Sequence, residues 1–208
     1  MKLLVFLFFL FVSVHSHALS NRSMASLGKE YVSKRDVQIH SILQRMMYQY
    51  KSANLDFDSV EQDEYLNREL GNYILERVIF LEAKSFGLAK VDETLVKREG
   101  SKVLARILKS EFSKMWKSLG VETDEYDIFV EQKLRSRKFI SIKKEAAQVL
   151  VTDREIDQYM EQNKMEKELF SQEKLRSRVK QYLGNKQGEK QLREWFELLR
   201  NKYQVRVL

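Results

Sequence analysis

A long apolar stretch in the first half of the chain most constrains what this sequence folds into. Residues 72–88 read Asn-Tyr-Ile-Leu-Glu-Arg-Val-Ile-Phe-Leu-Glu-Ala-Lys-Ser-Phe-Gly-Leu, and only Glu76 and Arg77 interrupt the apolar first half of this stretch. A helix that is apolar on nearly every side must be surrounded by other elements. Gly87 predicts where the helix ends, because glycine accepts the left-handed conformation that follows a last helical turn. We therefore expect a central helix inside a helical domain.

The beginning of the chain is typical of a secretory signal peptide. Lys2 precedes an apolar run over residues 3–14 that is too short to span a bilayer comfortably, and Ser-His-Ala at 16–18 supplies the small residues of a cleavage site. We expect residues 1–18 to be removed by cleavage before Leu19. The mature protein is then predicted to be soluble, exported and periplasmic.

The composition of the chain excludes several classes of chemistry. It contains neither cysteine nor proline, so it has no disulfide, thiolate nucleophile or Cys-based metal site, and long uninterrupted helices are favoured. Removing Lys2 with the signal peptide leaves 36 basic against 30 acidic residues, a net charge of +6. The two signs alternate along the chain, which is typical of solvated helix faces, and we expect no nucleic-acid partner.

Two short segments near the ends of the mature chain are predicted to be strands. Residues 27–33 alternate roughly, and residues 203–208 read Tyr-Gln-Val-Arg-Val-Leu, with β-branched alternation. Each is the other's only evident partner, so we expect a small two-stranded sheet that brings the two ends together. After the first strand, Ser33 and Asp36 have the spacing of a capping box at a helix start.

Helical spacing of apolar residues accounts for most of the remaining sequence. The central helix is predicted to begin at Asp58 or Ser59. A later helix begins at Val-Thr-Asp-Arg-Glu-Ile, where Thr152 and Glu155 form a full capping box. The last helix begins near residue 171, and its glycines at 184 and 188 predict a break or kink. Residues 19–208 are assigned to one domain, with 27–162 as its N-terminal part and 171–208 as the closing helix and strand.

The sequence offers no candidate catalytic or metal site. His40 is the one histidine outside the signal peptide, and we assign it a structural role within a helix, with its hydrogen bonds satisfied. Without a second histidine or any cysteine, the common acid–base, nucleophilic and zinc sites lack their residues. We find no glycine-rich phosphate loop and no other short catalytic motif, so we expect no cofactor and no enzymatic activity.

Four motifs in a fixed order resemble the SurA/PpiC/PrsA group of exported chaperones and peptidyl-prolyl isomerases. They are Gly-Lys-Glu-Tyr-Val-Ser-Lys-Arg-Asp-Val at 28–37, Leu-Glu-Ala-Lys-Ser-Phe-Gly-Leu at 81–88, Val-Thr-Asp-Arg-Glu-Ile-Asp-Gln-Tyr at 151–159, and the closing Trp195 to Val207. Lys29 departs from the usual opening motif. The resemblance covers most of the mature chain and implies a SurA-like helical chaperone core.

One departure from that group bears directly on activity. In its isomerase members a parvulin domain lies between the third and fourth motifs, whereas here only a short stretch around residues 163–168 lies there. The parvulin active-site residues have no counterpart, so the isomerase activity is not carried over.

The resemblance implies an ATP-independent periplasmic chaperone, a holdase, for unfolded outer-membrane or other exported proteins. The alternative is a helical envelope adaptor that binds one specific folded partner, and a third interpretation is an enzyme whose site the sequence does not reveal. Peripheral contact with anionic envelope surfaces and a homodimer formed by exchange of the terminal element are further expectations.

Methionine and aromatic residues suit promiscuous binding because their side chains adapt to many partners. On that basis the predicted client-binding residues are Met46, Met47, Tyr50, Phe112, Met115 and Trp116. The competing interpretation of each is a buried core position. Six cations form a basic band that we interpret either as a solvated surface or as a surface that attracts acidic partners: Lys133, Arg135, Arg137, Lys138, Lys143 and Lys144.

Overall fold

The computed structural model describes residues 22–48, 62–149, 151–163 and 172–208, which form seven helices and one small sheet. In chain order the elements are β1 (Ser23–Leu27), β2 (Glu30–Ser33), α1 (Lys34–Tyr48), α2 (Asp63–Ser85), α3 (Glu93–Leu108), α4 (Ser113–Ser118), α5 (Thr123–Val149), α6 (Asp153–Gln162), α7 (Gln172–Lys202) and β3 (Val205–Val207). The predicted mainly α-helical fold is confirmed. The predicted signal peptide and the predicted helix start at Asp58 or Ser59 lie outside the described residues.

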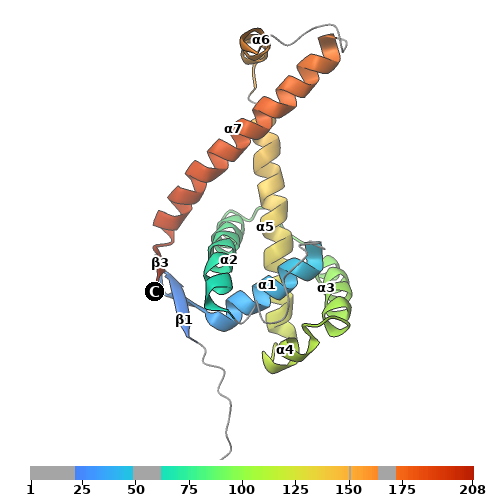
Figure 1. Cartoon of the computed structure of the whole chain (residues 1–208), viewed down its shortest axis with the longest axis vertical. Helices are drawn as coiled ribbons and strands as arrows, with labels where there is room; N and C mark the ends of the chain where they lie inside the picture. The colour runs from blue at the N-terminus through green and yellow to red at the C-terminus, as the bar shows by residue number, and fades with distance from the viewer. Residues whose placement is uncertain (1–21, 49–61, 150, 164–171) are drawn as a thin grey trace, which may run out of the picture.

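The helices form a body and a projecting arm (Figure 1). The body consists of α1 to α4 and the first half of α5. The second half of α5 extends away from the body, α6 lies at the far end, and α7 returns along the arm, crossing α5 before it reaches the sheet. Two helices, α5 and α7, therefore link the two parts of the molecule.

Helix α2 has the central position that its sequence predicts. It packs against α1, α5 and α7, and its buried side chains include Leu66, Leu70 and Val78. Its end is also as predicted: Gly87 has a φ of +65°, and the backbone N–H of Leu88 donates to the carbonyl of Ala83 at 2.8 Å.

The N-terminal strand prediction is wrong in detail, because residues 27–33 are not one strand but the last residue of β1, a two-residue turn and β2. Gly28 has a φ of +60° and is the first of two loop residues between β1 and β2, the position at which type II′ hairpins require glycine. The sheet has three antiparallel strands in the order β2-β1-β3, and Leu27 of β1 pairs with Val205 of β3. The two ends of the described chain therefore meet, as predicted, with β1 as the shared middle strand.

The predicted break in the last helix is also wrong, because α7 runs without interruption through Gly184 and Gly188. Both glycines are buried and lie on the helical face that carries Trp195, whose ring contacts Phe139 of α5. Helix α7 packs against α5 and α6, and this packing stabilises the helix through both positions. Helix–helix packing therefore overrides the low helix propensity of glycine, about 1 kcal/mol per residue relative to alanine.

A buried carboxylate fastens the end of α7 to the body. Glu82 of α2 accepts hydrogen bonds from Lys202 Nζ at 2.6 Å and from the Tyr203 hydroxyl at 2.9 Å. Burial and the hydrogen bond to Glu82 raise the pKa of Tyr203 to about 12, so its hydroxyl remains a donor at neutral pH. This contact holds α7 at the point where the chain turns into β3.

Removing this carboxylate tests whether the closure stabilises the whole molecule. We expect Glu82→Ala to lower the free energy of unfolding by about 2 kcal/mol, because the substitution leaves the Tyr203 hydroxyl and Lys202 without their acceptor. The measurement is urea unfolding followed by circular dichroism. Glu189→Gln, at an exposed position of α7, is the control and should change the value by less than about 0.5 kcal/mol. Equal effects of the two substitutions would show that Glu82 does not fasten α7.

Candidate functional site

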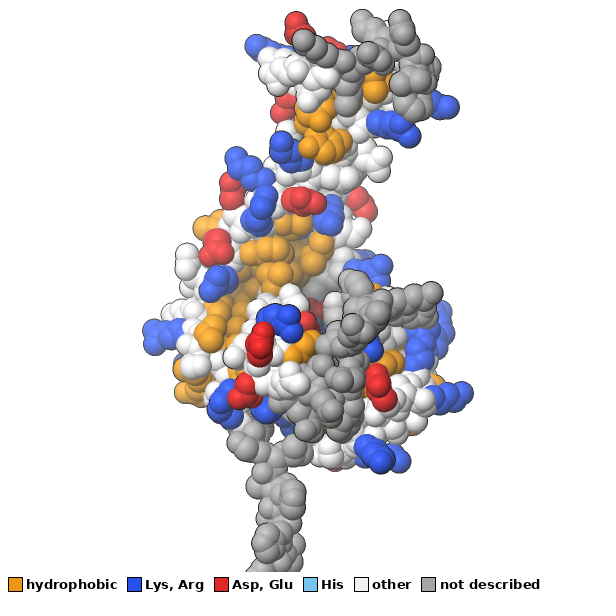
Figure 2. Space-filling view, in the orientation of Figure 1, with side chains coloured by type: hydrophobic (Ala, Val, Ile, Leu, Met, Phe, Trp, Pro, Cys, Tyr) orange, Lys and Arg blue, Asp and Glu red, His pale blue; other side chains and the backbone are white. Residues whose placement is uncertain are grey.

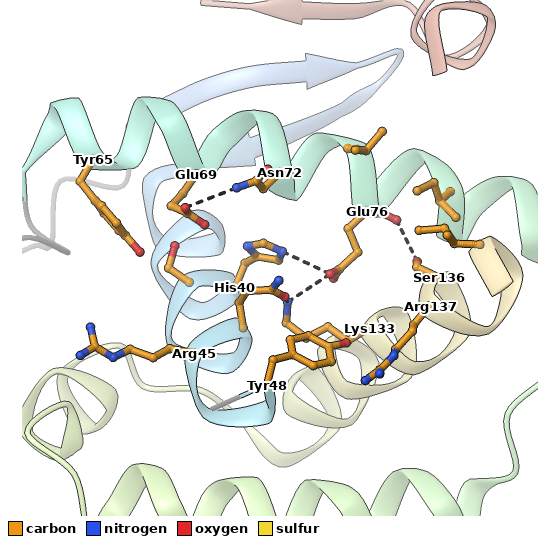
Figure 3. A pocket seen from close by; sticks show the side chains of 15 residues that line it. His40, Arg45, Tyr48, Tyr65, Glu69, Asn72, Glu76, Lys133, Ser136 and Arg137 are labelled. Atoms are coloured by element: carbon orange, nitrogen blue, oxygen red, sulfur yellow. Dashed lines mark hydrogen bonds and ion pairs between the residues drawn. The ribbon is translucent and has the colours of Figure 1, made fainter. Parts of the chain in front are cut away.

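A pocket of about 650 Å³ lies between α1, α2 and α5 (Figure 3). Helices α1 and α2 provide most of its wall, and α5 provides the rest. The lining residues are His40, Ser41, Gln44, Arg45, Tyr48, Tyr65, Glu69, Asn72, Leu75, Glu76, Ile79, Lys133, Ser136, Arg137 and Ile140. Polar and apolar side chains therefore share one depression.

A buried polar cluster joins the three helices at this pocket. Lys133 of α5 has a fully buried side chain, and its Nζ lies 3.1 Å from Glu76 Oε2 of α2 and donates to Gln44 Oε1 of α1 at 2.9 Å. His40 Nε2 lies 3.3 Å from the same oxygen of Glu76. Gln132 Nε2 donates to the other oxygen, Oε1, at 3.1 Å. The Glu76 carboxylate is thus the common acceptor of the cluster.

The protonation states follow from burial and these contacts. Burial alone would raise the pKa of Glu76, but the charge of Lys133 and the hydrogen bonds from His40 and Gln132 outweigh it and lower the pKa to about 2. Burial and the charge of Lys133 lower the pKa of His40. Burial also lowers the pKa of Lys133, against the attraction of Glu76. At neutral pH Glu76 is therefore a carboxylate and His40 is uncharged.

The predicted role of His40, structural and with its hydrogen bonds satisfied, holds for only one of its two ring nitrogens. Because a carboxylate only accepts, an uncharged His40 donates through Nε2 to Glu76, which leaves Nδ1 as an acceptor. This Nδ1 is buried and has no hydrogen-bond partner within the described part of the chain. The ring also packs edge-on against Tyr73, with 5.3 Å between centroids.

The pocket offers binding contacts rather than a recognisable reaction centre. The hydroxyl of Ser41 donates to the carbonyl of Val37 at 2.8 Å, and that of Ser136 donates to the carbonyl of Glu76 at 3.0 Å. Neither hydroxyl is paired with His40 as a nucleophile would be. No group of three or more metal-ligating side chains occurs in the ranges that the structure describes.

An apolar surface continues from the pocket toward α7. We define this apolar surface by four half-buried residues, Leu75, Ile140, Trp195 and Phe196, which pack around a buried cluster that includes Ile79 and Phe139. Leu75, Ile79 and Ile140 also line the pocket. Figure 2 shows hydrophobic side chains gathered where α2, α5 and α7 meet, with charged side chains around them. The pocket and the apolar surface thus form one continuous site.

The structure does not bring the predicted client-binding residues together at this site. Phe112, Met115 and Trp116 are only 1%, 4% and 6% exposed and belong to the main core, so their side chains are not accessible. Their helical spacing reflects packing: the Trp116 ring lies edge-on against Tyr126 at 5.7 Å. Met46 and Met47 are half-buried against the same core, and Tyr50 lies outside the described residues. The competing interpretation, a buried core position, holds for Phe112, Met115 and Trp116.

The predicted basic band is likewise not one solvated surface. Lys133 is buried in the cluster with Glu76, and Arg135 is 7% exposed. The guanidinium of Arg135 donates to the carbonyls of Leu88 at 3.1 Å and Ala83 at 3.3 Å, so it caps the end of α2. The remaining four cations are exposed: Arg137, Lys138, Lys143 and Lys144.

Sequence reasoning missed the polar cluster although a signal for it was present. Glu76 interrupts an otherwise apolar helix, and Lys133 occurs one turn after Phe129 and Val130 on the inner face of the next long helix. A charged residue at a core position is rarely tolerated without an opposite charge. Two such residues of opposite sign therefore indicate a buried pair.

The pH dependence of stability tests the state of His40. In the unfolded chain its pKa returns to the ordinary 6.5, and in the folded protein the pKa is lower. The unfolded state therefore binds the proton first, and the free energy of unfolding should fall as the pH drops from about 7.5 to 5.5, by at most about 1.4 kcal/mol per pH unit. Urea unfolding of the chain from Leu19 onward measures this. His40→Gln should remove most of the decrease, and an identical decrease in both proteins would contradict the assignment.

Comparison of the chain with protein-family models, with curated proteins and with solved structures finds no match. The resemblance to the SurA/PpiC/PrsA group therefore stays a prediction. The structure itself shows a mainly α-helical fold with a pocket and an adjoining apolar surface.

Proposed function

We propose that this chain is an ATP-independent chaperone that holds non-native polypeptides at the apolar surface, without peptidyl-prolyl isomerase activity. The observation that carries this proposal is the set of half-buried side chains between α2, α5 and α7: Leu75, Ile140, Trp195 and Phe196. Partly exposed aromatic and aliphatic side chains gathered in one place are typical of sites that bind other polypeptides.

The arm supports binding of an extended segment rather than of a small molecule. At its far end Tyr159, Met160 and Leu183 pack around a small core formed by α6 and α7, and Tyr182 is 49% exposed. In Figure 2 hydrophobic side chains at this end are separated from the apolar surface by charged ones. An unfolded chain is long enough to reach both places, and the charged side chains between them favour solubility of the free protein.

The length of the connection between α6 and α7 supports the absence of isomerase activity. Helix α6 ends at Gln162 and α7 begins at Gln172, so the interval is far shorter than a domain.

An export signal at residues 1–18, if it is cleaved as its sequence predicts, would place the chaperone in the periplasm, with unfolded outer-membrane or exported proteins as clients. No helix in the described ranges is long and apolar enough to cross a membrane.

A light-scattering assay tests the proposal. An unfolded outer-membrane β-barrel protein is diluted out of denaturant, without ATP, in the presence of the chain from Leu19 onward. We expect the chain to suppress aggregation. Leu75→Ser should require about tenfold more protein for the same effect, because it removes roughly 1.4 kcal/mol of apolar contact at the site. Leu108→Ser is the matched control, since Leu108 is an exposed residue of α3 outside the site, and it should act like the unchanged chain.

Two results would overturn the proposal. Unchanged aggregation, together with capture of a single folded envelope protein, would favour the adaptor. Acceleration of prolyl isomerisation in a parallel peptide assay would show that the chain is an isomerase after all. Melting temperatures of both variants must match that of the unchanged chain within a few degrees, so that a loss of activity reports the site and not unfolding.

A further inference from the structure

We propose that this site prefers apolar client segments that are followed closely by a carboxylate, and that Arg137 binds the carboxylate at the pocket. The inference rests on the proposed chaperone function and specifies its substrate class. It depends on one exposed cation, on the charges around it and on the apolar residues beside it.

Arg137 is the cation of the pocket that remains available for a ligand. It is exposed, and its guanidinium lies over the ring of Tyr48 at 5.0 Å from the centroid. Within the described ranges no acidic side chain forms a salt bridge with it. The other pocket cations are engaged: Lys133 pairs with Glu76, and Arg45 lies 3.6 Å from Glu111.

The acidic residues of the pocket do not oppose an anion at this position. Glu76 is buried and its charge is balanced by Lys133 at 3.1 Å. Glu69 accepts a hydrogen bond from Asn72 at 3.3 Å, and Figure 3 shows it well separated from Arg137, toward the beginning of α2. Lys143, with its Nζ 5.4 Å from the centroid of the Trp195 ring, adds positive charge at the apolar surface. The local charge near Arg137 is therefore positive and favours a carboxylate.

The apolar residues beside Arg137 determine what the rest of the ligand must be. Leu75 and Ile140 line the pocket together with Arg137 and also belong to the apolar surface. A ligand whose carboxylate reaches Arg137 therefore has apolar groups within a residue or two of it. A polypeptide segment with aliphatic or aromatic residues before an acidic side chain or a free C-terminus meets this requirement, because extended residues advance about 3.3 Å each.

The test compares two forms of one short apolar fluorescein-labelled peptide, ending either in a free carboxylate or in an amide. Fluorescence anisotropy gives the Kd of each for the chain from Leu19 onward, at low salt. We expect the carboxylate form to bind about fivefold more tightly, as a partly exposed charge-assisted contact provides, and the preference should shrink at high salt. Arg137→Gln should abolish the preference, so that the two peptide forms bind with the same Kd. Lys144→Gln removes one exposed charge of the same helix outside the pocket and should retain the preference.

The outcomes separate this inference from the proposed function. Equal binding of both forms by the unchanged chain would overturn the carboxylate preference and leave the chaperone proposal standing. Absence of binding of either form would contradict the chaperone proposal itself. Laurate is measured in parallel, and an Arg137-dependent affinity for laurate without any peptide binding would identify a small-molecule site and overturn the inference. A preference that Lys144→Gln also removes would show a general effect of charge rather than a contact with Arg137.

Discussion

The buried contact between Glu76 and Lys133 is the interaction on which the rest of this structure depends. It joins α2 to α5 at 3.1 Å, and Gln44 and His40 attach α1 to the same pair. Neither charge is stable in the core alone, because removal of one partner from a buried pair typically costs about 3–5 kcal/mol, a large share of a typical domain's free energy of unfolding of about 5–15 kcal/mol. The pair therefore fixes how these three helices meet.

The pocket and the apolar surface are consequences of this junction. Leu75 lies next to Glu76 on α2, and Ile140 lies two turns beyond Lys133 on α5, so the polar contact sets the separation of the apolar residues that flank it. From the other side, α7 covers the buried cluster with Trp195 and is fastened to α2 through Glu82. The apolar surface therefore lies directly beside the polar cluster and is only partly covered by α7. We propose that this incomplete coverage gives the chain its binding surface for non-native polypeptides.

Short-range signals in the sequence predicted local structure well. The capping box of Ser33 and Asp36 is present, with the Ser33 N–H donating to the carboxylate at 2.8 Å, and that of Thr152 and Glu155 is complete. Such signals succeed because both partners lie within one helical turn, so no other part of the fold has to be known. Gly87 ends α2 for the same reason.

Apart from the pairing of the two chain ends, most features that depend on distant residues were beyond sequence reasoning. Gly184 and Gly188 predict a break, although both are buried within one continuous helix. Phe112, Met115 and Trp116 have the same helical spacing whether they face a client or the core. The candidate site also combines residues far apart in the chain, such as Leu75 and Trp195, which no periodicity connects. Among the residues of the candidate site, Glu76 and Lys133 carried a readable signal, because a charge within an apolar face requires a partner.

A site-specific fluorescence measurement tests most directly whether clients bind at the apolar surface. Because the chain has no cysteine, Lys143→Cys places a single environment-sensitive label beside Trp195, and Lys117→Cys places the same label on α4 as a control. Our account predicts that an unfolded client shifts the emission of the label at 143 to shorter wavelength and leaves the label at 117 unchanged. A shift at 117 alone, or no shift at 143 while the client is demonstrably bound, would contradict it.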